Sequence, residues 1–310
     1  MRLVIARSIL ISPAVLAALC TPVAAQTQPA ARFNADATLV LIPVTVTDAT
    51  NRFVLGLRKQ DFRLLEDGSE QTIAHVSGED APLSIGIVFD ISGSMDYKLR
   101  ISRQAAVQFL KTMNREDEAF LVAFSDHAAL VSGFTSQVED LHRNLLSLQP
   151  GGLTALLDAA QFALQEMKKA RNPRKAILMI SDGGDNNSRY SAKQIQALVR
   201  EADVQVYAMG VFEPSIFAGM TAEEISGPRL LAEIAEQTGG RVFAASDPND
   251  LPSVATRIGI ELRNQYVLAY SPKNETKDGK FRKVEVKVAE PGGLGALKLR
   301  WRLGYYSPSQ

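Results

Sequence analysis

The sequence predicts an α/β protein in which helices cover both faces of a mainly parallel sheet, with further β-strands on either side of this domain. Between residues 83 and 263, apolar segments alternate with segments of helical periodicity. The apolar segments lack polar alternation, which is typical of parallel strands buried on both faces. Residues 37–80 and 264–308 contain only strand-like segments, which predicts the flanking strands.

The first 25 residues have the pattern of a secretory signal peptide. Arg2 and Arg7 precede an apolar segment at residues 8–19, and small residues at 23–25 offer a cleavage site. The apolar segment is too short to span a bilayer, so we expect no integral membrane segment after cleavage, with a retained anchor as the alternative. We therefore expect an exported protein, either periplasmic or secreted.

The composition limits the classes of partner. The 310 residues are 46% apolar and 22% charged, with 34 basic and 34 acidic side chains, which suits about two globular domains. Without a basic excess, nucleic acid is not an expected partner. Cys20 is the only cysteine, so cleavage of the signal leaves no disulfide, and the fold depends on its core and any bound metal.

The flanking strands are expected to complete one another. After a linker at residues 26–36, β-branched and apolar segments separated by turn signals predict strands at 38–47, 61–65, 71–76, 266–270, 281–288 and 297–303. Three C-terminal strands are too few for an independent sandwich, and so are the three or four before residue 80. We expect segments 37–80 and 264–308 to form one β-sandwich of about seven strands, with the α/β domain at 83–263 inserted into it. Two separate β appendages are the alternative.

The α/β domain itself is predicted from two kinds of periodicity. Ile101, Ala105, Phe109 and Met113 recur at four-residue spacing and give a helix one apolar face. Similar spacing predicts helices at 154–170, 192–201, 230–237 and 251–262, and apolar segments predict strands at 83–89, 119–124, 128–131, 176–180, 204–211 and 241–244. The segments at 119–124 and 128–131 are expected to form a hairpin.

Oxygen-bearing side chains follow two of these strands and open one helix. Ligand sites of open parallel sheets lie beyond the carboxyl ends of the strands, so we expect these side chains to lie close together. Carboxylates and hydroxyls are hard oxygen ligands of the kind that Mg²⁺ prefers. The predicted metal ligands are Asp90, Ser92, Ser94, Thr154 and Asp182.

This ordered set resembles the metal-ion-dependent adhesion site of the von Willebrand factor type A domain. That family carries a D-x-S-x-S loop, a later threonine and a later aspartate, and all five positions are matched here. The resemblance covers residues 83–263 and implies a Rossmann-like doubly wound sheet. The flanks, including Gln265-Tyr266-Val267-Leu268 and Gly304-Tyr305-Tyr306, are similar to those of secreted bacterial proteins described as VWFA-related domain proteins.

The resemblance also implies a role for each ligand. In the family the two serines bind the ion directly, the threonine binds directly or through water, and the aspartates act largely through water. We expect Mg²⁺ as the ion, with Mn²⁺ or Ca²⁺ as alternatives. Because Mg²⁺ keeps several waters when few protein ligands are offered, we expect it to bridge to a Glu or Asp of a protein partner, in adhesion or envelope assembly. No catalytic residue is expected, and we predict that the protein is not an enzyme.

Two other functions stay open. A Mg²⁺-dependent phosphatase also places an aspartate after a strand, but such sites carry a second acid two residues later, where this chain has Ser92, and no lysine is placed by motif to hold a phosphoryl group. A structural envelope protein with a purely stabilising metal is the other alternative. Each motif alone can also be a helix cap or a turn, which is how we interpret Asp96 and Asp185.

One segment between a strand and a helix is a candidate for partner selection. Residues 212–221 include Phe217 and Met220, which would form an apolar rim near the metal if they are exposed. The alternative is that these side chains fold inward. His75, His127 and His142 lack the spacing of zinc ligands.

Overall fold

A computed structural model describes residues 39–78, 81–210, 222–245, 247–289 and 296–309. The predicted signal peptide at 1–25 and the linker at 26–36 lie outside the described residues, as do Phe217 and Met220.

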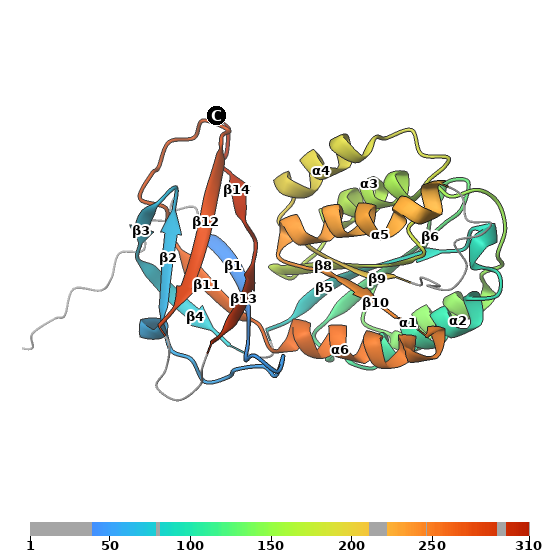
Figure 1. Cartoon of the computed structure of the whole chain (residues 1–310), viewed down its shortest axis with the longest axis horizontal. Helices are drawn as coiled ribbons and strands as arrows, with labels where there is room; N and C mark the ends of the chain where they lie inside the picture. The colour runs from blue at the N-terminus through green and yellow to red at the C-terminus, as the bar shows by residue number, and fades with distance from the viewer. Residues whose placement is uncertain (1–38, 79–80, 211–221, 246, 290–295, 310) are drawn as a thin grey trace, which may run out of the picture. The chain divides into compact units, whose positions relative to one another are not determined.

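A six-stranded sheet forms the centre of the α/β domain (Figure 1). Its order is β10-β9-β8-β5-β6-β7, and neighbouring strands are parallel except for the antiparallel hairpin β6–β7. The strands are β5 Leu83–Asp90, β6 Glu118–Phe124, β7 Ala128–Thr135, β8 Arg174–Ser181, β9 Gln205–Gly210 and β10 Val242–Ala244. Every residue of β5, β6 and β9 is buried, which explains why these segments lack polar alternation. The predicted fold class is confirmed.

Helices cover both faces of this sheet (Figure 1). One face carries α1 Leu99–Leu110, α2 Val138–Ser147 and α6 Leu251–Arg263, and the other carries α3 Leu156–Met167, α4 Ala192–Glu201 and α5 Ala222–Ala235. Single 3₁₀ turns lie at η1 Lys59–Asp61, η2 Gly93–Met95, η3 Glu236–Thr238 and η4 Pro248–Asp250. Among the described residues, no helix has the length and apolar character needed to cross a lipid bilayer.

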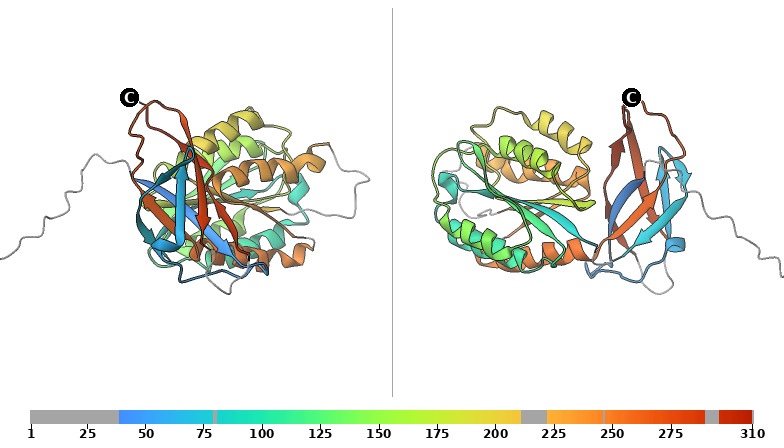
Figure 2. Two further views of the ribbon diagram at one scale, coloured as in Figure 1. Left: turned by 60° about the vertical axis from the view of Figure 1, so that its left-hand side comes forward. Right: turned by 180° about the vertical axis from the view of Figure 1, so that it is seen from behind.

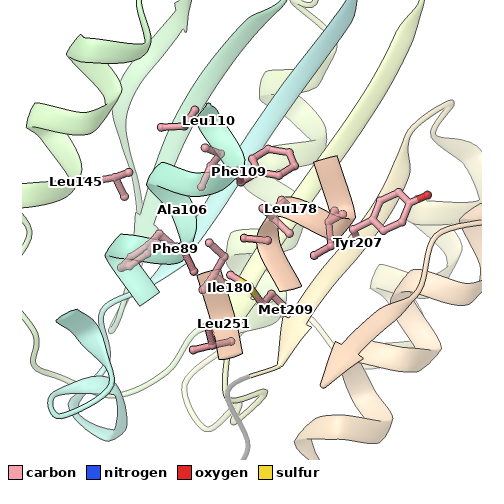
Figure 3. Close-up of a cluster of buried hydrophobic side chains, with 14 of the residues drawn as sticks. Phe89, Ala106, Phe109, Leu110, Leu145, Leu178, Ile180, Tyr207, Met209 and Leu251 are labelled. Atoms are coloured by element: carbon pink, nitrogen blue, oxygen red, sulfur yellow. The ribbon is translucent and has the colours of Figure 1, made fainter. Parts of the chain in front are cut away.

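The core on the α1 side anchors the strand ends that lead to the candidate site (Figure 3). Phe89 of β5 and Ile180 of β8 are fully buried in the same cluster as Phe109 of α1 and Leu251 of α6. Burying a side chain of this size contributes about 1.5–3 kcal/mol. Since Phe89 and Ile180 directly precede Asp90 and Ser181 in sequence, this packing holds the ends of both strands in place.

The remaining strands form two four-stranded antiparallel sheets (Figure 2). Their orders are β13-β1-β11-β4 and β14-β12-β2-β3. The strands are β1 Val40–Thr47, β2 Phe62–Glu66, β3 Ser69–Gln71, β4 Ile73–Ser77, β11 Tyr266–Tyr270, β12 Phe281–Val288, β13 Lys298–Trp301 and β14 Gly304–Tyr306. Strands from before and after the α/β domain pair within both sheets, and their inward side chains share one core that includes Ile42, Leu64 and Leu268. The expected single β-sandwich is confirmed.

The last predicted strand is in fact two strands. The apolar spacing predicts one strand over 297–303, but β13 ends at Trp301 and pairs with β1, whereas β14 begins at Gly304 and pairs with β12. The chain therefore passes from one sheet of the sandwich to the other at Arg302 and Leu303.

Two helices also differ from the expectation. The sequence does not predict α2, because only Leu141 and Leu145 of this helix are buried and the apolar pattern is correspondingly short. Helix α5 begins at Ala222 and contains Pro228, whereas apolar spacing predicts a helix only over 230–237. An interior proline usually ends or kinks a helix, so the sequence pattern underestimates α5.

Candidate metal centre

The five predicted ligands lie at the carboxyl edge of the six-stranded sheet. Asp90 ends β5, Ser92 and Ser94 lie on the loop and the turn η2 that follow, Thr154 precedes α3, and Asp182 directly follows β8. Ser94 is half-buried and the other four are buried. The five residues thus occupy three loops at one edge of the sheet.

Backbone hydrogen bonds join two of these loops. Gly93 N donates to Gly152 O at 3.0 Å, and Gly151 N donates to Ile91 O at 2.8 Å. Gly152 has a φ of +87°, and a Cβ atom built on it would lie 2.6 Å from Oδ2 of Asp126. A glycine is therefore required where the loop before α3 crosses the loop after β5.

The third loop holds Thr154 from the other side. Thr154 N donates to Asn186 Oδ1 at 2.9 Å, and the N–H groups of Asn186 and Asn187 both donate to Thr154 O at 3.0 Å. Asp126 Oδ1 accepts from Leu153 N at 2.8 Å. Hydrogen bonds within the protein therefore join these loops.

Asp90 is a buried acid whose hydrogen-bond donors are neutral groups of Ser92 and Ser181. Ser92 N donates to Oδ1 at 2.8 Å, and the Ser181 hydroxyl donates to Oδ2 at 2.6 Å. Burial and the neighbouring Asp182 carboxylate raise the pKa of Asp90 to about 7, against the lowering effect of these hydrogen bonds. Ionised Asp90 is therefore poorly compensated, and a cation beside it would stabilise its charge.

The donor set fits a hard divalent cation. The hydroxyl oxygens of Ser92 and Ser94 lie 3.2 Å apart, and the Asp90 carboxylate is fixed beside them by its bond to Ser92 N. Within the described ranges, no group of three His, Cys, Asp or Glu side chains lies together in a way that could hold a metal. Metal binding at this edge would therefore depend on hydroxyl oxygens as well as carboxylates, which suits Mg²⁺.

A lysine that the sequence motifs do not indicate also lies in the site. Lys98 Nζ donates to Asp182 Oδ2 at 3.2 Å, and both side chains are only 6% exposed. Burial is the largest single influence and opposes the charge, but Asp182 and Tyr97 together outweigh it, and the pKa of Lys98 is raised. Lys98 is therefore charged, and it neutralises one of the two acids.

The loop of Asp182 depends on a close approach between two glycines. Gly183 has a φ of +84°, and a Cβ atom on it would lie 2.6 Å from the carbonyl carbon of Gly227 in α5. Gly183 N also donates to the Ser181 hydroxyl at 2.9 Å, so the same hydroxyl positions both Asp90 and the turn after Asp182.

The two nearby acids that we interpret as cap and turn residues lie outside this ligand set. Asp185 Oδ1 accepts from the Ser188 hydroxyl at 2.5 Å and from Leu157 N at 3.3 Å, so it helps to fix the start of α3. Asp96 is exposed and ends the turn η2.

Comparisons with known proteins identify the α/β domain. The family model of the von Willebrand factor type A domain matches residues 84–257. A similar protein is an uncharacterized protein of Borreliella burgdorferi, 26% identical over 200 residues, which are 58% of this chain and 58% of that protein. Inter-alpha-trypsin inhibitor heavy chain H4 of Bos taurus is 28% identical over 134 residues, or 39% of this chain. The chain covers 15% of the length of heavy chain H4.

The solved structures agree on the fold. A von Willebrand factor type A structure from Catenulispora acidiphila matches with a TM-score of 0.53 at 14% sequence identity. It covers 89% of this chain and 74% of that one.

Proposed function

Because the chain belongs to the von Willebrand factor type A domain family, whose domains are generally protein-binding or adhesion-type modules rather than enzymes, we propose that it is an exported protein that binds a protein partner through Mg²⁺. The proposed ligands are Asp90, Ser92, Ser94, Thr154 and Asp182. The observation that carries the proposal is the pair of buried acids, Asp90 and Asp182, beside serine hydroxyls and only partly neutralised by Lys98.

The chain contributes a preformed set of oxygen ligands. When bound, Mg²⁺ would supply an open coordination position for an oxygen of an external carboxylate. Asp90 and Asp182 balance charge, and Ser92, Ser94 and Thr154 offer neutral oxygens. Because hydrogen bonds between the three loops already fix these groups, little ordering is needed when the site is filled.

Exposed apolar side chains beside the site support a protein as the partner. Tyr97 is 64% exposed and precedes Lys98, and Leu153 is 51% exposed and precedes Thr154. Ile225 is 53% exposed, two residues before the Gly227 that packs on the Asp182 loop. Large apolar and aromatic side chains around a polar centre are typical of protein interfaces. Phe217 and Met220 stay predicted members of the same rim.

Metal-dependent capture is the direct test of this function. The purified protein is titrated with Mg²⁺ by calorimetry and used for pull-down from envelope extract with Mg²⁺ or with chelator. We expect Mg²⁺ binding and partner capture to be lost in Asp90→Ala and to be kept in Asp96→Asn, which changes an exposed acid on the same loop. Capture that persists in Asp90→Ala and in chelator would contradict the proposal.

The same experiment separates the alternative functions. If chelator lowers the melting temperature but releases no partner, the metal is purely stabilising. Lys98 is the one observation that favours a phosphatase, since a lysine beside two acids could hold a phosphoryl group. Ser92 still stands where such sites carry a second acid, so we expect no Mg²⁺-dependent hydrolysis of p-nitrophenyl phosphate. Hydrolysis that is lost in Asp90→Ala would favour the enzyme instead.

The rim has its own test. We expect the double variant Tyr97→Ala/Leu153→Ala to weaken partner binding about tenfold or more while Mg²⁺ affinity stays unchanged. Leu146→Ala is the matched control, because Leu146 is 55% exposed but lies on α2. Replacing residues 212–220 with a short Gly/Ser link is expected to act in the same direction as the double variant. Equal losses in the double variant and the control would contradict a specific rim.

Export is proposed from the pattern of residues 1–25. We propose that the mature chain begins at Gln26 and carries the metal-binding domain at 83–263 within a sandwich built from 37–80 and 264–308. Mass spectrometry of the protein recovered from the periplasm or the medium tests this, and full-length chain found only in the cytoplasm would contradict it.

A further inference from the structure

Lys98 brings a positive charge into the candidate metal centre. Its Nζ lies 3.2 Å from Asp182 Oδ2, and the Tyr97 ring lies over the ammonium at 5.1 Å from the ring centroid. Charges held this far from water interact more strongly than surface charges do. The lysine therefore affects every other charge that enters the site.

The balance of charge in the site changes sign when a divalent ion enters. Without a metal, ionised Asp90 and Asp182 outnumber Lys98 and leave one excess negative charge. A divalent cation added to the same three side chains leaves one excess positive charge. One carboxylate from a partner then makes the site neutral.

We propose that Lys98 is a specificity-determining residue that weakens metal binding to the free protein and makes metal and partner carboxylate bind more cooperatively. The proposal rests on the metal-dependent function proposed above. One contact and one electrostatic effect support it. The ammonium occupies an oxygen of Asp182, and it would repel a cation placed between the two acids. An incoming carboxylate removes the excess positive charge, so each ligand raises the affinity of the other by the same factor.

A purely structural ion pair would behave differently. If Lys98 only held Asp182 in place, its removal would lower the stability of the fold and would leave Mg²⁺ affinity unchanged or weaker. Under our proposal, its removal strengthens Mg²⁺ binding and reduces the effect of added carboxylate. The two roles therefore predict opposite changes in the same measurement.

The experiment measures Mg²⁺ affinity by calorimetry in wild type, Lys98→Met and Lys98→Gln, each with and without excess acetate at ionic strength matched by chloride. Glutamine keeps a hydrogen-bond donor for Asp182 without the charge, and it serves if the methionine variant does not fold. Lys111→Met, which removes an exposed lysine at the other end of α1, controls for net charge. Urea unfolding is followed in parallel.

We expect Lys98→Met and Lys98→Gln to bind Mg²⁺ about tenfold more tightly than wild type in the absence of acetate. Acetate should tighten Mg²⁺ binding severalfold in wild type and Lys111→Met, and by a clearly smaller factor in the Lys98 variants. Folded Lys98 variants with unchanged or weaker Mg²⁺ affinity would overturn this inference and leave the proposed function standing. Absence of Mg²⁺ binding in wild type and all variants would overturn the proposed function and this inference together.

Discussion

The two edges of the six-stranded sheet both bury acids, but they balance the charge differently. At the amino edge, Asp117 and Glu118 each pair with an arginine, Arg263 and Arg171 respectively. Asp117 also accepts from Leu83 N at 2.8 Å. Each of these two acids has its own cation and a main-chain donor, so the buried negative charge at this edge is compensated.

At the carboxyl edge, two acids share one cation. Lys98 pairs with Asp182, while the donors to Asp90 are neutral: a main-chain N–H and the hydroxyls of Ser181 and Ser92. A buried carboxylate without a cation is costly for the fold, and such imbalance is more typical of functional sites than of structural ones. The contrast teaches that the candidate site differs from the rest of the buried acids in its uncompensated charge, and not in burial alone.

The largest effect is expected from removing a compensating arginine at the amino edge. Arg263→Met leaves Asp117 buried without its cation and should lower the free energy of unfolding by about 3 kcal/mol. Urea denaturation measures the change, which should be the same with Mg²⁺ and with chelator because this edge lies opposite the metal site. Arg257→Met, an exposed arginine on the same helix, should change stability little. A loss that Mg²⁺ repairs would contradict the separation of the two edges.

An intermediate effect on stability is expected from the titration of Asp90 at the carboxyl edge. In chelator, folded Asp90 holds its proton up to a pKa of about 7, compared with 3.8 for the ordinary carboxyl. The folded state thus binds the proton more tightly, so stability should fall as pH rises, by on the order of 2 kcal/mol between pH 5 and pH 7. Asp90→Asn should remove this component from melting curves recorded between pH 5 and pH 8. If melting temperature changed with pH in the same way in both proteins, the raised pKa of Asp90 would be contradicted.

The smallest effect should come from Glu118 and should have the opposite sign. Burial would raise the pKa of Glu118, but donors from Arg171 and Ser84 outweigh it and hold this pKa below its usual value of 4.5. Its contribution is present above that range and is lost as pH falls through the lowered pKa. Because Arg171 is exposed, we expect about 1 kcal/mol. The difference between wild type and Glu118→Gln in urea unfolding should therefore shrink below pH 4.5, and a constant difference would refute it.

Much of the fold could be predicted from the sequence, because burial determines which positions are apolar. Strands buried on both faces are continuously apolar, and residues that follow such strands must meet at one edge. This reasoning brings Asp90 and Asp182 together correctly. It does not find α2, whose buried face consists of Leu141 and Leu145.

The residues that the sequence pattern misses act through tertiary contacts. Lys98 meets Asp182 across 84 residues of chain, and no local spacing signals that pair. The sequence does offer a signal for Ser181, because this residue places a hydroxyl at the last position of a buried strand, beside the predicted ligand Asp182. The sequence around Asn186 indicates only an ordinary turn, and its role depends on the hydrogen bond that it accepts from Thr154 N.

The interleaving of strands in the sandwich has a consequence for the order of folding. Strand β1 lies between β13 and β11, and the bond from the Tyr266 hydroxyl to Val54 O joins residues 212 positions apart. As the chain emerges during synthesis, β1 must wait for both of its partners, and β2 for β12, until the whole α/β domain has been made. That domain can complete its sheet in the meantime, since its strands pair only with one another. The early strands expose unpaired edges during this interval, which makes them the part of the nascent chain most prone to aggregation.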